Sequence, residues 1–280
     1  MRTCTVAGRM ALVTLDGLVD VESASLGLFD SNPNRVFERW DEFREWAAGV
    51  APGGQQFSDQ SLGAPSPCPR QVFAIGLNYA DHAAESGVAV PLDPLTFTKF
   101  PSSITGPNQS LRLPSGNVDW EAELVVVIGR SAKDVRAADA WSHVAGFTVG
   151  QDFSERVVQM QGSAPQFSLG KSFPGFGPTG PALVTVDELP DPGNLKIECV
   201  INGEIMQSSS TSNLVFSVPE LISRLSAVCE LLPGDLIFSG TPGGVGVSRK
   251  PMRYLIPGDQ VVTSIEGIGE IRQVCVDGQR

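Results

Sequence analysis

The 280-residue sequence has few cysteines, and their arrangement matches neither a zinc site nor a disulfide framework. The five are far apart in the chain, odd in number and without a Cys-x-x-Cys pair: Cys4, Cys68, Cys199, Cys229 and Cys275. This pattern is typical of a protein in a reducing compartment. The first ten residues also lack the apolar core of a secretory signal. We therefore expect a cytoplasmic protein.

Basic residues are also scarce. Lys and Arg total 20 against 31 Asp and Glu, which gives a net charge of −11, and no basic cluster stands out. Such a chain repels phosphate backbones, so nucleic acid is not an expected partner, whereas cations are. No apolar run approaches the roughly 18–20 residues of a membrane span. We expect no membrane partner either.

Long helical patterns are rare, while 30 glycines and 21 prolines indicate many turns and short strands. The turn-rich stretches 51–56 and 63–69 read as a linker. We therefore expect a small N-terminal α/β domain over residues 1–66 and a larger domain over residues 67–280. Apolar patterns predict strands over 71–76, 124–129, 144–150 and 195–201, and helices over 36–48, 79–85, 153–160 and 221–231. The last helix is opened by a Ser217-x-x-Glu220 capping box.

Acidic residues gather at the ends of two predicted strands. In a strand, residues i and i+2 point to one face, so Glu121 and Glu123 share a face opposite Trp120, Ala122 and Leu124. Carboxylates held side by side next to a buried run repel each other unless a cation lies between them, and a hard divalent cation suits oxygen ligands. The alternative is a solvated strand face. Asp152 follows another strand and is a third candidate ligand; its alternative role is a helix N-cap. Asp119 lies nearer the loop and is not counted as a ligand.

A histidine and a glutamate fall on one face of the predicted helix at 79–85. His82 and Glu85 are three residues apart, and a carboxylate beside an imidazole orients it and raises its proton affinity, as a general base requires. The alternative is a surface pair without function. His143 follows a polar helix and reads as structural.

Lys171 lies in a segment of glycines and prolines, residues 170–181, that predicts an irregular loop. The order Gly-x-x-x-x-Gly-Lys is absent, so this is not a phosphate-binding P-loop. A lysine in such a loop can reach an anionic substrate, or it can be an ordinary solvated side chain.

Taken together, these segments resemble the fumarylacetoacetate hydrolase family. The resemblance runs in family order over about residues 70–275 and rests on these matches: Gly76–His82, Ser102–Asn108, Asp119–Leu124, Val149–Arg156, Gly170–Phe173, Phe176–Pro181 and Ser239–Gly246. It implies an α+β fold with a rolled, mixed β-sheet in the larger domain. It also implies a homodimer and a small anionic 2-oxo acid as substrate.

The resemblance also implies roles for particular residues. The metal ligands would be Glu121, Glu123 and Asp152, with Mg²⁺ as the expected cation and Mn²⁺ or Ca²⁺ as alternatives. His82 and Glu85 would form the dyad that activates water, and Lys171 would be the active-site lysine. The expected substrate-binding residues are Arg156, Gln159 and Thr241. Gln151, Glu155 and Val157 depart from residues common in the family, which leaves the substrate open.

The implied reaction is the Mg²⁺-dependent hydrolysis of a carbon–carbon bond in a 2,4-dioxo acid, either acylpyruvate-like or derived from a sugar acid. The products would be a carboxylic acid and pyruvate or a related 2-oxo acid. The same site would also suit decarboxylation, keto–enol isomerisation or dehydration of a 2-oxo acid. A more remote alternative is a metal-binding module without catalysis, but such a module has no need of a general base.

Overall fold

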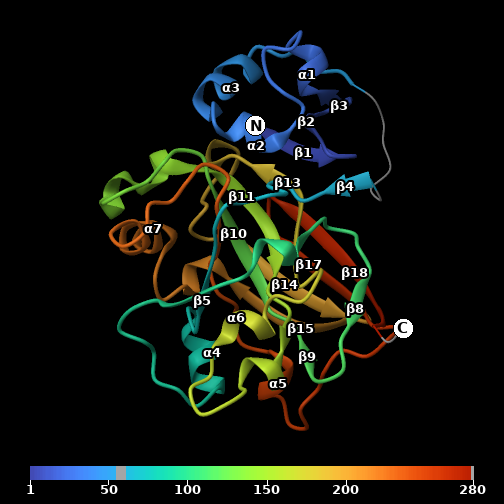
Figure 1. Ribbon diagram of the computed structural model, residues 1–280, viewed down its shortest axis with the longest axis vertical. Coiled ribbons are helices and arrows are strands. Elements are labelled where there is room, and N and C mark those ends of the chain that lie inside the picture. Colours follow the sequence, from blue (N-terminus) through green and yellow to red (C-terminus); the bar gives the residue numbers. More distant parts are fainter. Residues whose placement is uncertain (55–60, 279–280) are drawn as a thin grey trace.

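The computed structural model describes residues 1–54 and 61–278 and contains two large β-sheets with short helices (Figure 1). The helices are α1 (Val21–Ala24), α2 (Pro33–Phe37), α3 (Trp40–Ala47), α4 (Ala80–Glu85), α5 (Arg156–Gln159), α6 (Phe167–Gly170) and α7 (Val218–Ser226). Short 3₁₀ segments are η2 (Pro101–Ser103), η3 (Ala137–His143), η4 (Val186–Glu188), η5 (Thr211–Asn213) and η6 (Gly246–Ser248). In the described ranges, no helix has the length and apolar character needed to cross a bilayer.

The larger sheet has eleven strands in the order β3-β2-β1-β13-β11-β10-β16-β5-β6, with β4 paired to β1 and β7 paired to β13. Its strands are β1 (Arg2–Val6), β2 (Arg9–Thr14), β3 (Gly17–Asp20), β4 (Leu62–Gly63), β5 (Val72–Gly76), β6 (Leu95–Thr98), β7 (Ile104–Thr105), β10 (Ala122–Ile128), β11 (Val144–Gln151), β13 (Gly177–Val184) and β16 (Leu236–Phe238). Most neighbours are antiparallel, but β16 pairs with β5 and β13 with β7 in parallel. The predicted mixed sheet and the α+β class are confirmed.

The second sheet has five strands: β15 (Glu204–Ser210), β14 (Lys196–Ile201), β17 (Gln260–Ile265), β18 (Gly269–Asp277) and β8 (Leu111–Leu113). A short ribbon joins β9 (Val118–Asp119) to β12 (Ser154–Glu155). The two large sheets pack against each other, with β10 over β14 and β11 over β17.

Strand β10 is buried on both faces, and its side chains alternate between two cores. Leu124 and Val126 join the core between the sheets. Val125 and Val127 join a second core with aromatic side chains of the N-terminal helices. Trp120, Ala122 and Leu124 all lie in the first core, so the predicted division of faces around Glu121 and Glu123 is confirmed.

The N-terminal strands belong to the same sheet as the rest of the chain, since Arg2 pairs with Val184 and Thr3 with Leu183. The division at residue 66 stays a prediction. Of the predicted linker, residues 55 and 56 lie outside the described ranges.

The predicted strands differ from the observed ones by one or two residues at either end, whereas three predicted helices differ more. The helix expected over 153–160 is only α5, because Ser154 and Glu155 pair with β9 and the Glu155 carboxylate caps the helix at the N–H groups of Val157 and Val158. The helix over 36–48 is divided between α2 and α3, and α7 ends at Ser226 rather than Leu231.

The segment over 170–181 is not all irregular, because β13 begins at Gly177. Pro181 is tolerated there because the pairing with β11 shifts register next to it: Val149 lies opposite Gly180, but Phe147 lies opposite Val184. A proline can occupy such an irregularity, where its missing N–H costs no ladder bond.

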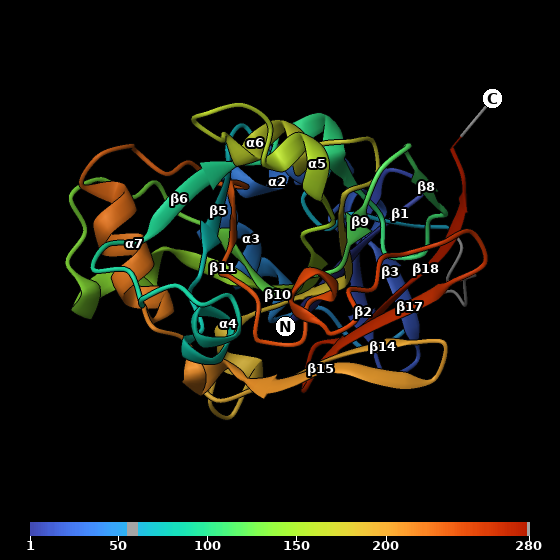
Figure 2. The same cartoon turned by 90° about the horizontal axis from the view of Figure 1, so that it is seen from below.

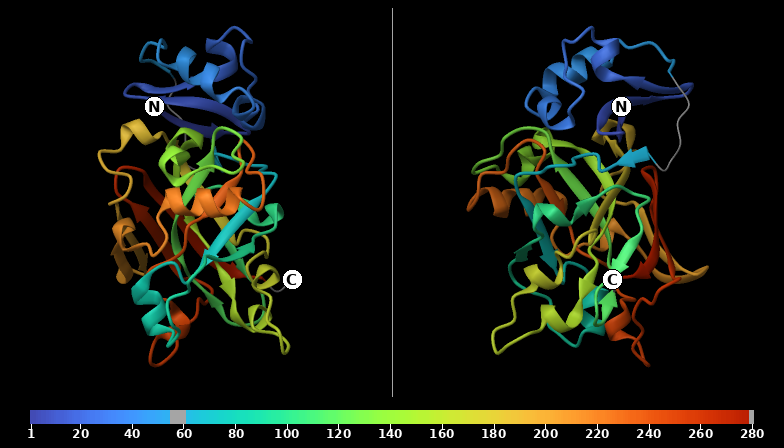
Figure 3. Two further views of the ribbon diagram at one scale, coloured as in Figure 1. Left: turned by 90° about the vertical axis from the view of Figure 1, so that its left-hand side faces the viewer. Right: turned by 45° about the vertical axis from the view of Figure 1, so that its right-hand side comes forward.

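Helices α4, α5 and α6 gather at the end of the molecule away from β1–β3 and α1–α3 (Figure 3). Viewed from that end, α4 lies on one side of β10 and β11, and α5 and α6 lie on the other (Figure 2). Residues expected to form the site therefore come from different elements at one end of the fold.

Candidate active site

Three carboxylates meet where β10 begins and β11 ends. The antiparallel pairing places Ala122 opposite Gln151, so the residues just outside the two strands, Glu121 and Asp152, are brought together. The Asp152 N–H donates to the Glu121 carbonyl at 2.9 Å. Glu123 completes the group, and one carboxylate oxygen of each residue lies within 4.8 Å of the others. The predicted convergence of these acids is therefore present.

All three acids are buried, and Glu123 has no cationic side chain bonded to it among the described residues. Its Oε2 accepts the Gly240 N–H at 2.8 Å. Burial, followed by the charges of Asp152 and Glu121, raises the pKa of Glu123 well above its ordinary value. The raised pKa means that the surroundings of Glu123 carry too little positive charge to stabilise its ionised form.

Lysine side chains supply part of that positive charge. Lys171, at the C-terminal end of α6, donates from Nζ to Glu121 Oε2 at 2.6 Å and to Asp152 Oδ2 at 2.8 Å. Burial opposes its charge, but Asp152 and Glu121 outweigh burial, and the pKa of Lys171 is raised. Lys171 is therefore a buried, protonated lysine rather than a solvated one.

Lys99 approaches Asp152 from the other side, with its Nζ 2.6 Å from Oδ1, and also donates to the Lys171 carbonyl. It is fully buried, and burial lowers its pKa despite the neighbouring Asp152. Nothing in the sequence marks Lys99 as a site residue, because a lysine after a short alternating strand resembles any lysine at the end of a strand.

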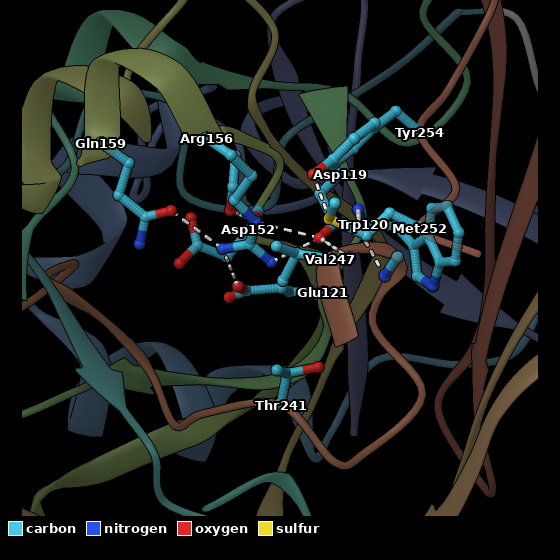
Figure 4. A network of polar contacts seen from close by, with 12 residues as sticks. Asp119, Trp120, Glu121, Asp152, Arg156, Gln159, Thr241, Val247, Met252 and Tyr254 are labelled. Atoms are coloured by element: carbon cyan, nitrogen blue, oxygen red, sulfur yellow. Dashed lines mark hydrogen bonds and ion pairs between the residues drawn. The ribbon is translucent and has the colours of Figure 1, made fainter. Parts of the chain in front are cut away.

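Arg156 links the acids to the loop after β16 (Figure 4). Its Nη1 lies 2.8 Å from Glu121 Oε1 and 2.9 Å from Gln159 Oε1, while Nε and Nη2 bond Asp119 Oδ2 at 2.9 and 2.7 Å. Asp119 also accepts the N–H groups of Gly246 and Val247. Arg156 therefore reaches the acidic group directly, while Gln159 is joined to that group through Arg156.

The charges of these neighbours act on Glu121. Burial favours its neutral form, but Lys171, Arg156 and His82 outweigh that effect and lower its pKa to about 2. Glu121 is thus ionised while Glu123 resists ionisation. The two glutamates, two residues apart, have opposite pKa shifts.

His82 and Glu85 are joined to each other within α4. Nδ1 of His82 lies 2.8 Å from Oε1 of Glu85, and Oε2 of Glu85 accepts the Gly244 N–H at 2.8 Å. A carboxylate oxygen accepts hydrogen bonds, so Nδ1 is the donor in this contact, and in the neutral imidazole Nε2 therefore carries the lone pair. The predicted pairing is present. His143, by contrast, is half-buried in η3, with Nδ1 2.9 Å from the Ser131 carbonyl.

Thr241 follows Gly240, whose N–H bonds Glu123, and is itself buried. Its Oγ1 accepts from Gln207 Nε2 at 2.8 Å. Gln207 also accepts the Ala122 N–H at 2.9 Å, and Gln151 accepts the Glu121 N–H at 2.8 Å. Two buried glutamines thus bind the consecutive N–H groups of Glu121 and Ala122 at the start of β10.

The departures from the family pattern have structural roles. Gln151 donates to Thr263 Oγ1 at 2.7 Å and to Cys199 Sγ, both in the second sheet. Glu155 caps α5, and Val157 is exposed on the same helix. Gln151 and Glu155 therefore hold backbone in place.

The donor set fits a divalent cation. Three buried carboxylates supply hard oxygen ligands, and Glu123 would regain its charge if a cation bound beside it. The residues that would hold the cation are Glu121, Glu123 and Asp152.

Fold and site together define a class: an α+β enzyme with a buried carboxylate site for a divalent cation, flanked by lysines, an arginine and a His–Glu pair. Residues 71–276 match the model of the fumarylacetoacetate (FAA) hydrolase C-terminal family. The chain belongs to this family of enzymes, as its motifs predicted.

Relatives and solved structures agree with the assignment. The oxaloacetate tautomerase FAHD2A of Bos taurus, a mitochondrial protein, is 51% identical over 216 residues, which cover 76% of this chain and 69% of that protein. A Mycobacterium smegmatis protein provisionally named HpcE superposes with a TM-score of 0.95 at 53% identity, covering all of both chains. Maleylpyruvate hydrolase from Sphingobium sp. SYK-6, solved with manganese(II) and pyruvate, gives a TM-score of 0.80 at 28% identity, also covering both chains fully.

The cytoplasmic assignment made from the sequence is wrong by this comparison, because the tautomerases of cattle, human and rat are mitochondrial proteins. Unpaired cysteines and the lack of a secretory core are shared by proteins of every compartment that keeps thiols reduced. They cannot single out the cytoplasm.

Proposed function

We propose that this chain is a divalent-cation-dependent enzyme that interconverts the keto and enol forms of a small 2-oxo dicarboxylic acid of the oxaloacetate type. The observation that carries the proposal is the convergence of three buried carboxylates with Lys171 and Arg156. Keto–enol isomerisation was one of the alternatives left open by the sequence. The 51% identity with an oxaloacetate tautomerase supports it over the hydrolysis first expected.

Tautomerisation needs a base at carbon 3 and a stabilised oxygen at carbon 2. A divalent cation on Glu121, Glu123 and Asp152, with Mg²⁺ as our proposal, would supply a Lewis acid next to the 2-oxo oxygen. Nε2 of His82 accepts the proton as the C3–H bond breaks, because Glu85 holds the imidazole in that tautomer. The His82 imidazolium then gives up a proton, directly or through water, to the 2-oxo oxygen, which completes the enol and restores the base, and the reverse sequence restores the ketone.

Two cationic side chains suit an anionic substrate. Lys171 has three N–H donors and uses two of them on Glu121 and Asp152, which leaves one for a substrate oxygen on which negative charge develops. Arg156 and Gln159 lie at the edge of the same acidic group and bind the substrate carboxylate in this proposal. Since tautomerisation adds no water, the dyad serves as a proton carrier.

Hydrolysis of a 2,4-dioxo acid is the second candidate, favoured by the His82–Glu85 pair and by the likeness to maleylpyruvate hydrolase. In that reaction the base takes its proton from water, which attacks the 4-oxo carbon. The product separates the candidates, since tautomerisation conserves every atom and hydrolysis yields two acids.

The test uses pure protein with Mg²⁺ or Mn²⁺. The ultraviolet absorbance of enol-oxaloacetate is followed while released pyruvate is measured in parallel, and a panel of acylpyruvates is assayed for cleavage. We expect accelerated enol–ketone conversion that stops on chelation and is lost in Glu123→Gln. Cleavage of an acylpyruvate without any effect on oxaloacetate tautomerisation would replace the first candidate with the second.

A further inference from the structure

The side chain of Gln207 is buried on β15 and bonded to main-chain groups on both sides of the site. Its Oε1 accepts the Ala122 N–H at 2.9 Å. Its Nε2 donates to the Pro242 carbonyl at 2.8 Å and to Thr241 Oγ1 at 2.8 Å. One amide therefore joins the strand that carries Glu121 and Glu123 to the loop that carries Thr241.

The amide orientation follows from the chemistry of its partners. A main-chain N–H can only donate and a main-chain carbonyl can only accept. The Gln207 oxygen must therefore face Ala122, and its NH₂ group must face Pro242 and Thr241. A flipped amide would set donor against donor at Ala122 and acceptor against acceptor at Pro242.

This orientation determines what the Thr241 hydroxyl does. Because Oγ1 accepts from Gln207, the hydroxyl proton remains to be donated elsewhere. Within the described ranges, the bond from Gln207 is the one hydrogen bond that Oγ1 makes. Thr241 is adjacent to Gly240, which bonds Glu123, and it lies below Glu121 in the view of Figure 4.

We propose that Gln207 is a positioning residue that fixes the polarity of Thr241, so that Thr241 presents an O–H donor to an oxygen of the anionic substrate. The inference rests on the proposed function, since it needs an oxyanion ligand at this site. Carboxylate and 2-oxo oxygens are acceptors, so a hydroxyl held as a donor matches them.

Two variants at position 207 separate this role from simple support of the strand. Gln207→Glu keeps an acceptor for the Ala122 N–H but puts an acceptor beside Thr241, which turns the hydroxyl proton away from the ligand. Gln207→Met removes the hydrogen bonds to Ala122, Thr241 and Pro242 but leaves the Thr241 hydroxyl free to donate. Measurement at about pH 9 favours the ionised form of the introduced carboxyl.

The measurements are KM and kcat on oxaloacetate and the Kd of oxalate for the Mn²⁺-loaded protein by calorimetry, with Mn²⁺ affinity determined separately. We expect Gln207→Glu and Thr241→Val each to weaken oxalate binding and raise KM by about tenfold or more, as for a lost hydrogen bond to a charged group. Gln207→Met should cost less, and Gln207→Glu should add less than about twofold in a Thr241→Val background. Gln260→Glu, an exposed strand position, is the matched control.

A strand-supporting role gives the reverse order. If Gln207→Met weakens oxalate at least as much as Gln207→Glu, or if the Gln207→Glu effect is unchanged in Thr241→Val, the proposal is overturned while the proposed function stands. Wild-type protein that neither converts oxaloacetate nor binds oxalate would overturn both.

Discussion

His82 and Glu85 are linked by a 2.8 Å contact between Nδ1 and Oε1, while the second oxygen of Glu85 is occupied by the Gly244 N–H. The carboxylate is thereby fixed at both oxygens. Both contacts use a Glu85 oxygen as the acceptor. The tautomer of the His82 imidazole is therefore determined by the loop that carries Gly244 as well as by α4.

Glu85→Gln should inactivate His82 as a proton carrier without removing the His82 side chain. The Gly244 N–H still needs an acceptor, so the amide oxygen faces Gly244 and the NH₂ group faces His82. Nδ1 must then accept, the proton moves to Nε2, and the base is lost. We expect a fall in kcat of about 10²–10⁴-fold, as for removal of a general base.

Steady-state turnover of oxaloacetate tests this expectation, with His82→Gln for comparison. His143→Gln is the control, because His143 lies in η3 and its Nδ1 contacts the main-chain carbonyls of Arg130 and Ser131. A Glu85→Gln enzyme with wild-type kcat would contradict the assigned tautomer.

Glu123→Gln should abolish tight binding of a divalent cation. The substitution keeps the size of the side chain and the acceptor for Gly240 but removes one of three charges. Loss of a residue that only hydrogen-bonds a metal ligand lowers metal affinity roughly 10–100-fold. Glu123 is a direct ligand in our proposal, so we expect the Mn²⁺ affinity to fall by more than this. Calorimetric titration with Mn²⁺ measures it, with the exposed Glu270→Gln as control. Equal affinity in both variants would exclude Glu123 as a ligand.

The stability of the metal-free protein should fall as the pH rises. The folded-state pKa of Glu123 is raised by burial and by Asp152 and Glu121. The folded protein thus holds a proton that the unfolded chain releases near pH 4.3. Between that value and the raised pKa the native state binds more protons, so the free energy of unfolding decreases with increasing pH.

Thermal unfolding of chelated protein between about pH 5.5 and 9 reveals this slope. Glu123→Gln has no carboxyl to titrate at this position. The Tm of the variant relative to that of the wild type should therefore increase as the pH rises. Mn²⁺ should flatten the wild-type curve. Parallel curves for wild type and variant, both without metal, would contradict the shift.

Lys99→Met should destabilise the metal-free protein strongly. The change leaves Asp152 Oδ1 and the Lys171 carbonyl without their buried donor. Breaking a buried ion pair from one side costs about 3–5 kcal/mol. Urea unfolding measures the loss, and adding Asp152→Asn should recover part of it.

Lys196→Met is the control for this loss of a lysine. Lys196 is exposed and pairs with Glu198 on the surface, so we expect a change within about 0.5 kcal/mol. If Lys99→Met is no less stable than Lys196→Met, the buried contact contributes nothing.

Local signals were enough to predict much of the fold and part of the site. The apolar run before Gly129 specified a buried strand, and Ser217 with Glu220 specified the start of α7, including the reciprocal cap. Glu121 and Glu123 were found because a two-residue spacing fixes their shared face. In these cases the residues that determine the local structure lie within a few positions of one another in the sequence.

The contacts that could not be predicted are long-range. Gln207 lies 85 residues from Ala122, and Lys99 lies 53 residues from Asp152. Nothing in their local sequence distinguishes them from exposed strand residues. The start of α5 was misplaced for the same reason, because Ser154 and Glu155 pair with β9, more than 30 residues earlier in the chain.

The junction between β1 and β13 has a consequence for shortened forms of the protein. Residues 71–276 carry the family match and the site, but Leu183 and Val184 rely on Thr3 and Arg2 for their ladder partners. A fragment starting near residue 67 would leave hydrogen-bonding groups of β13 unpaired beside the apolar Leu183 and Val184, and such an open edge is a template on which further copies can assemble. The first strands thus protect the catalytic portion from self-association, although they contribute no group to the chemistry.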